Sequence, residues 1–214
     1  MRHVAGRLRV SVPVLFGRRC IAPLLANLAM EHPKLELELS FNDRPVDLLE
    51  DGFDLAVRNG DIGAGAGLMT RTVSLQRMTV CASPTYLAEH GQPETLEDLP
   101  AHQAITYACD VRCRKWQFPT ADGGLLDFTP PSRLHFDDLE AIADAAEAGH
   151  GLAWLPCWLI RDRVQSGVLI PLLGDVPRLV FKTHALWPKT PHLSLRVRLA
   201  IDALAAGLPG CVEL

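Results

Sequence analysis

The chain has 214 residues, 48% of them hydrophobic, which is enough to bury one large core or two cores of about 100 residues each. No run of about 18 apolar residues occurs, so no membrane-spanning helix is predicted. The net charge is −4 at pH 7, and the basic residues form neither a cluster nor a helical stripe. Nucleic-acid binding by these residues is therefore not expected.

The amino terminus and the cysteines indicate the compartment. The first residues, MRHVAGRLRV, include basic side chains but neither an apolar core segment nor a small-residue cleavage site, so no secretory signal is predicted. The six cysteines are scattered over predicted helices, strands and loops, as is typical of free thiols. We therefore expect a cytoplasmic protein.

The first elements alternate between strand and helix. Leu8–Val12 is predicted as a strand, and the helix after it should begin near Arg18 or Arg19, because Pro23 is tolerated only in the first turns. Leu35–Phe41 alternates between apolar and polar residues, so we expect a strand with one wet side at the edge of a sheet.

The same alternation continues with a short helix over Val46–Glu50 and a strand over Phe53–Arg58. Gly60–Gly67 contains GAGAG rather than GxGxxG and leads into a predicted strand, so it is interpreted as a mobile loop and not as a dinucleotide site. Strands alternating with helices predict a parallel α/β sheet, which binds ligands beyond the carboxyl ends of its strands.

The later elements follow from apolar periodicity and from helix start signals. They are strands over Leu68–Leu75 and Arg77–Ala82, a helix from Ser83 to Gly91, a hairpin of Lys115–Phe118 and Leu125–Phe128, a strand over Arg133–Phe136, a helix from Asp138 to Gly149, strands over Gly151–Pro156 and Val180–Pro188, and a last helix that buries Val197, Ala200, Ile201 and Leu204.

Ordered segments along nearly the whole chain carry a family resemblance. They include GRLRVSVPVLFGRRCIAPLL, DLLEDGFDLAVRNG, VCASPTYLAEHG, AGHGLAWLP and ALWPKTPHLSLRVRLAIDAL. Their order and spacing resemble the effector-binding domain of LysR-type transcriptional regulators. The resemblance implies an α/β, type 2 periplasmic-binding-protein-like fold of two Rossmann-like lobes joined by two crossing strands.

The resemblance also implies a domain organisation. Lobe I would comprise residues 6–80 and 184–214, and lobe II residues 81–183. An effector would bind in the cleft between the lobes. The winged helix-turn-helix of the family is absent from this sequence, so we expect the sensory portion of a longer regulator, which reaches DNA only through the missing amino-terminal domain.

The resemblance places candidate effector-binding residues after the strands of both lobes. They are Val14, Phe16, Gly17, Asn42, Asp43, Arg58 and Asn59 from lobe I, and Tyr107, Cys109, Asp110, Asp137, Asp138, Leu155 and Pro156 from lobe II.

Several of these candidates have a structural alternative. The backbone at Phe16 and Gly17 is the expected anion cradle, and Arg58 the cation expected to hold a carboxylate bidentately. Arg58 is equally expected to form a structural ion pair with Asp43 or Asp54. Asp137 and Asp138 are first of all helix caps, and the aromatic candidates are compatible with core positions.

The charges of the candidate site bear on the chemistry of the ligand. Asp43 and Asp110 would repel a simple carboxylate, which leaves an amino acid, an amine or a polar aromatic molecule open.

Other function classes have less support. The sequence contains no GxSxG, HExxH or CxxC motif and no histidine pair with metal-ligand spacing, so we expect no enzyme, no metal and no cofactor. Cys109 and Cys113, which have cationic neighbours, support the alternative of a redox-sensing domain. Two ordinary reduced thiols are the favoured interpretation, because nothing in the sequence shows that the two are close or exposed. A solute-binding receptor is disfavoured by the missing signal segment.

The resemblance further implies a homodimer, with higher oligomers for the full-length protein and no membrane partner. The edge strand would pack against the last helix of a second subunit, with Glu36 and Glu38 near Arg196 or Arg198 across a two-fold axis. The alternative is that these charges are solvated.

Overall fold

The structure is a computed structural model that describes residues 4–44, 47–60, 62, 67–109, 112–113 and 115–212, without the side chains of residues 109, 112 and 113. The chain forms two compact units. Unit 1 contains the residues up to Leu75 together with those from Phe181 onward, and unit 2 is Gln76–Val180. Strand β4 (Leu68–Ala82) leads from unit 1 into unit 2, and β12 (Val180–Pro188) leads back.

Unit 1 contains a sheet whose first strands are parallel. Strand β1 (Ala5–Val12) lies between β2 (Lys34–Phe41) and β3 (Leu55–Asn59), and β12 pairs antiparallel with β3. Strand β2 ends the strand order, which confirms the predicted edge strand. Because β1, β2 and β3 run in the same direction, their carboxyl ends meet at one edge of the sheet.

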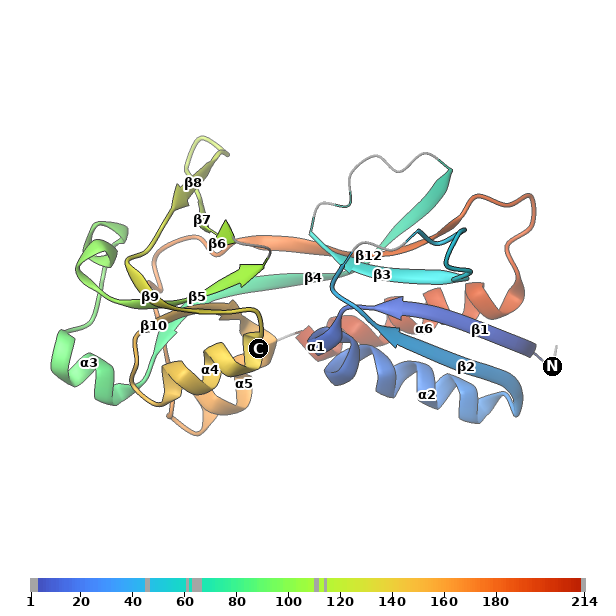
Figure 1. The fold of residues 1–214 in the computed structure, drawn as a ribbon, viewed down its shortest axis with the longest axis horizontal. Coiled ribbons are helices and arrows are strands. Elements are labelled where there is room, and N and C mark those ends of the chain that lie inside the picture. The colour runs from blue at the N-terminus through green and yellow to red at the C-terminus, as the bar shows by residue number, and fades with distance from the viewer. Residues whose placement is uncertain are drawn as a thin grey trace. The chain divides into compact units, whose positions relative to one another are not determined.

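Helices α2 (Ala22–Glu31) and α6 (Leu195–Val212) pack against each other, α2 also against β2 and α6 against β1 (Figure 1). The predicted helix start near Arg18 is wrong, because α1 (Val14–Phe16) already begins after Pro13 and continues through the π-helical segment Gly17–Ile21. Pro23 follows this wider turn directly, so its missing N–H and its ring are accommodated there.

Unit 2 contains a mixed sheet with helices around it. In its strand order β10 lies between β4 and β5, and β9 and β11 pair with β5 and β4. Its elements are α3 (Pro84–His90), the 3-10 helix η2 (Leu96–Ala101), β5 (Ala104–Cys109), β6 (Arg112–Cys113), β9 (Ser132–Phe136), α4 (Leu139–Glu147), β10 (Leu152–Pro156), α5 (Cys157–Gln165) and β11 (Ile170–Leu172).

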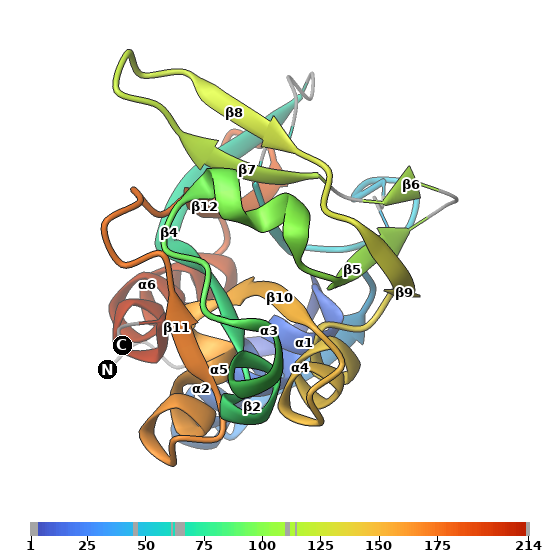
Figure 2. The ribbon, with the colours of Figure 1, turned by 90° about the vertical axis from the view of Figure 1, so that its left-hand side faces the viewer.

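A hairpin of β7 (Trp116–Pro119) and β8 (Leu125–Phe128) forms a separate two-stranded sheet in unit 2 (Figure 2). It confirms the predicted pairing of these segments. The Ser83 hydroxyl accepts from Tyr86 N–H and Asp138 Oδ1 accepts from Ala141 N–H, so the two predicted helix caps of this unit are also confirmed.

Two further element predictions are wrong. Leu68–Ala82 is one continuous strand instead of two, because the residues around Gln76 contain no turn signal and remain extended. The helix predicted over Val46–Glu50 is replaced in its described part by hydrogen-bonded turns, in which the Asp47 side chain accepts from the amides of Leu49 and Glu50. The rest of that prediction, and most of the glycine-rich loop, lie outside the described residues.

Two of the charges expected at the dimer contact, Glu38 and Arg196, have partners within the same chain. Glu38 accepts from Arg7 and Arg9, and its pKa is lowered by these two guanidinium groups. Arg196 donates to Asp54, with Nη2 and Oδ1 3.1 Å apart. Glu38 and Arg196 therefore already have partners within their own chain. The predicted pairing between subunits requires each of them to exchange this partner for one on the second subunit.

Candidate functional site

The carboxyl ends of β1 and β2 bring three candidate residues together. Asn42 N–H donates to the carbonyl of Val12 (2.8 Å), which closes the end of β2 onto β1. Val14 N–H, in the first turn after β1, donates to Asp43 Oδ1 (3.0 Å). Val14, Asn42 and Asp43 thus form one contiguous edge in unit 1.

Arg58 lies at the same edge, near the end of β3, and is half-buried. Its Nη1 donates to the carbonyls of Ser11 (3.2 Å) and Val57 (2.7 Å), and its Nη2 to Ser11 Oγ (2.7 Å) and, weakly, to the carbonyl of Arg44 (3.5 Å). All of these acceptors are uncharged. Burial lowers the pKa of Arg58, and the nearby Asp43 carboxylate opposes this effect.

These bonds change the role expected of Arg58. Asp54, one of its two anticipated partners, instead accepts from Arg9 N–H and from Arg196. Both Nη atoms of Arg58 have acceptors, so within the described residues Nε is the nitrogen left for a further acceptor. A carboxylate that binds Nε and Nη2 together therefore requires Nη2 to release its weak bond to Arg44.

The expected anion cradle is occupied. Gly17 N–H donates to the carbonyl of Pro13 (2.7 Å), and Val14 N–H is taken by Asp43. The Phe16 side chain is only 2% exposed, so it belongs to the core. A ligand anion at this turn would have to replace the Asp43 carboxylate.

Asn59 and Ser11 shape the rest of this edge. Asn59 Oδ1 accepts from Thr183 Oγ1 (2.9 Å), which ties the end of β3 to β12. Ser11 is fully buried and holds Arg58 through both its carbonyl and its hydroxyl. Ser11 was missed as a functional candidate, although a hydroxyl between the buried Val10 and Val12 is a detectable signal.

The candidates in unit 2 have more structural roles. Leu155 is fully buried, and it and Pro156 pair with β4 through Thr79 and Met78. Asp137 and Asp138 are both exposed, and Asp138 is the N-cap of α4. Tyr107 is half-buried in β5. Asp110 and the side chains of Cys109 and Cys113 lie outside the described residues.

Two negative findings apply to the described part of the chain. No group of histidine, cysteine, aspartate or glutamate side chains there is arranged to hold a metal ion. No helix there is both long and apolar enough to cross a membrane.

Comparisons with known proteins agree with this architecture. A sequence profile described as "LysR substrate binding domain" matches residues 2–209. The chain is 32% identical over 203 residues to the HTH-type transcriptional regulator YhjC of Escherichia coli K12, covering 94% of this chain and 68% of that protein. It spans about two thirds of the length of the curated relatives it matches.

Solved structures show the same fold. Full-length AphB, a virulence activator of Vibrio cholerae, matches with a TM-score of 0.81 and 26% identity over 96% of this chain and 69% of that one. The regulatory domain of CrgA from Neisseria meningitidis matches with a TM-score of 0.79 and 27% identity over 95% and 98% of the two chains.

Together these findings define an α/β regulatory domain with a type 2 periplasmic-binding-protein-like fold. The chain belongs to the LysR substrate-binding domain family of bacterial transcriptional regulators, whose members bind small-molecule effectors and act as oligomers on DNA. The family and the relatives are regulators rather than enzymes.

Proposed function

We propose that this chain is the non-catalytic, cytoplasmic sensory domain of a longer LysR-type regulator and that its effector contacts Arg58. The supporting observation is that, among the residues the structure describes, this half-buried guanidinium bonds only to uncharged oxygens. It therefore keeps a positive charge at the edge where parallel α/β sheets bind ligands. The other candidate residues of both lobes, with the lobe boundaries given above, remain part of this proposal.

The neighbouring charges narrow the effector's chemistry. Asp43 is exposed and lies close enough to Arg58 to affect its pKa. A ligand with an anionic group for Arg58 and a cationic or donor group for Asp43 matches both charges, whereas a plain anion meets repulsion from Asp43. We therefore propose a small zwitterionic or polar molecule, of which an amino acid is the simplest example.

A thermal-shift screen of amino acids, aromatic acids, amines and sugars tests this proposal. A ligand that binds only the folded state stabilises it by about 2.7 kcal/mol at a concentration of 100 times Kd. For a compound that stabilises the protein, we expect Arg58→Gln to weaken binding about ten- to a hundredfold, since a hydrogen bond to a charged group contributes about 1.5–3 kcal/mol.

Lys34→Gln is the matched control, because it removes an exposed charge at the amino end of β2, away from the strand ends that form the site. Titration calorimetry of both variants measures the affinities, and thermal melting without ligand verifies that Arg58→Gln is folded. An unchanged affinity in Arg58→Gln removes Arg58 from the site.

We also propose that the chain forms a homodimer, and that it controls DNA binding through an amino-terminal DNA-binding domain of the full-length regulator. The exposed Met30 on α2 and the edge strand β2 supply an unpaired surface for a second copy. Sedimentation at tens of micromolar tests the pairing. A monomer at that concentration contradicts it for this chain.

A further inference from the structure

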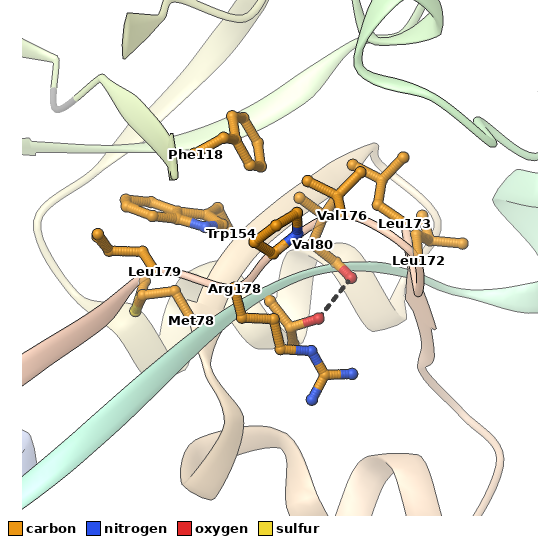
Figure 3. Close-up of a pocket in the computed structure, with 11 residues that line it drawn as sticks. Met78, Val80, Phe118, Trp154, Leu172, Leu173, Val176, Arg178 and Leu179 are labelled. Carbon is orange, nitrogen blue, oxygen red and sulfur yellow. Dashed lines mark hydrogen bonds between the residues drawn. The ribbon is translucent and has the colours of Figure 1, made fainter. Parts of the chain in front are cut away.

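A small pocket lies entirely within unit 2, among β4, β7, β10 and the segment between β11 and β12. Figure 3 shows Phe118 and Trp154 on one side of it, with Leu172, Leu173 and Val176 on the other. The walls are mostly apolar and aromatic, and the ring centroids of Phe118 and Trp154 are 6.5 Å apart. Such walls favour a flat apolar ligand.

Trp154 is the polar feature of this pocket. Its side chain is nine-tenths buried, with 9% exposure. Within the described part of the chain its indole N–H has no hydrogen-bond acceptor, and no bond from it to another lining residue appears in Figure 3. The indole nitrogen is not fully enclosed by the protein, so an acceptor from outside the chain can reach it. Buried tryptophan N–H groups ordinarily have partners.

The pocket wall also carries backbone strain. Leu173 adopts φ 56°, the left-handed region that disfavours residues with a side chain, and it lies in the segment that leads into β12. The space within the pocket holds about one water molecule. An aromatic ring is larger than this space, so it enters only when the walls of the pocket move apart.

Charge near the pocket favours a ligand that carries an acceptor. Arg178 is half-buried, and its Nη1 lies 3.9 Å from Cys157 Sγ, a weak acceptor. No carboxylate in the described part of the chain forms an ion pair with it. The guanidinium extends away from Phe118, so it contributes positive potential rather than a direct contact (Figure 3).

We propose that this pocket is a second small-molecule site, selective for a small aromatic compound with a carbonyl oxygen that accepts from the Trp154 indole N–H. The pocket is separate from the Arg58 edge, so the inference does not rest on the proposed function. Its outer segment joins β12 directly, and Leu179 carbonyl accepts from Met78 N–H (2.9 Å) on β4. A bound ring would therefore act on both strands that connect the units.

Acetophenone and ethylbenzene form a matched pair of probes, because they are similar in shape but only acetophenone has an acceptor. In the protein labelled with ¹⁵N, the four tryptophans give separate indole N–H signals in NMR spectra. We expect acetophenone to shift the Trp154 signal saturably and to bind about five- to tenfold more tightly than ethylbenzene, the effect of one hydrogen bond.

Three variants make the inference falsifiable. Trp154→Phe keeps the ring but removes the donor, so acetophenone should bind no better than ethylbenzene. Trp158→Phe is the control, because its N–H already donates to Gln76 Oε1 (2.7 Å), and acetophenone affinity should be unchanged. Leu173→Gly removes strain and wall volume and should bind acetophenone at least as tightly as the unaltered protein.

Absence of a saturable shift, in both the unaltered protein and Leu173→Gly, overturns the proposal and leaves a pocket that holds only water. Equal affinity for the two probes, or unchanged acetophenone affinity in Trp154→Phe, also overturns it.

Discussion

Replacing Gly17 with alanine tests the packing beneath the Arg58 edge. An added Cβ would lie 2.5 Å from Val12 Cγ2, 3.0 Å from Val12 Cβ and 3.2 Å from Phe41 Cδ1. Val12 is fully buried and β-branched, so it has no alternative position to adopt. Overpacking a core costs about 1–3 kcal/mol, against which alanine regains up to about 1 kcal/mol of helix propensity.

We therefore expect Gly17→Ala to lower the free energy of unfolding by about 1–2 kcal/mol, which lowers Tm by about 2–8 °C for a chain of this size. Thermal melting followed by circular dichroism measures the change. Gly210→Ala, in α6, is the control: its added Cβ meets no atom within 4 Å, so stability should be unchanged or slightly raised. If Gly17→Ala is as stable as the unaltered protein, the reasoning about this turn is wrong.

Two further predictions concern unit 2. The Arg163 side chain is 19% exposed and links α5 to Glu140, Asp144 and Glu147 on α4, so Arg163→Ala should lower the free energy of unfolding in urea by about 1–3 kcal/mol. Lys115→Ala breaks an exposed ion pair with Asp127 and should lower it by less than about 1 kcal/mol. Equal losses of stability in the two variants would contradict this contrast. Burial and the nearby His90 lower the pKa of His102, and Asp98 acts in the opposite direction. Below pH 6.5 His102 therefore binds a proton more readily in the unfolded chain than in the folded one, and the free energy of unfolding falls. His102→Asn should flatten the decline in urea midpoint between pH 7.5 and 5, and an unchanged decline would exclude His102 as its source.

The sequence predicted the elements with strong local signals. The period-two pattern of Leu35–Phe41 identified β2 and its edge position, and Ser83 followed by Pro84 marked the start of α3. The hairpin of β7 and β8 followed from the turn-rich segment between two short apolar runs. In each case the local preference agrees with the tertiary structure.

Other features depend on contacts that sequence patterns do not contain. The helix can start as early as Val14 because the π-helical segment Gly17–Ile21 accommodates Pro23 within it. Nothing in the sequence of this chain marks such a segment. Helix α5 was missed because its short apolar run follows the buried β10 directly. At the candidate site, residue identity suggested Arg58 as a carboxylate clamp, but the register of β1 and β3 placed Ser11 beside it and used its Nη donors.

The most direct test of the sensory role is an amide ¹H–¹⁵N NMR titration with a compound that raises Tm in the effector screen. The proposal predicts that the largest shifts in unit 1 fall on Ser11 to Val14, Asn42 to Arg44 and Val57 to Asn59, and that in Arg58→Gln they reach half of their maximum only at a ligand concentration about ten- to a hundredfold higher. Shifts that avoid these residues, or an unchanged midpoint of the titration in Arg58→Gln, would contradict an effector site at the carboxyl ends of β1, β2 and β3.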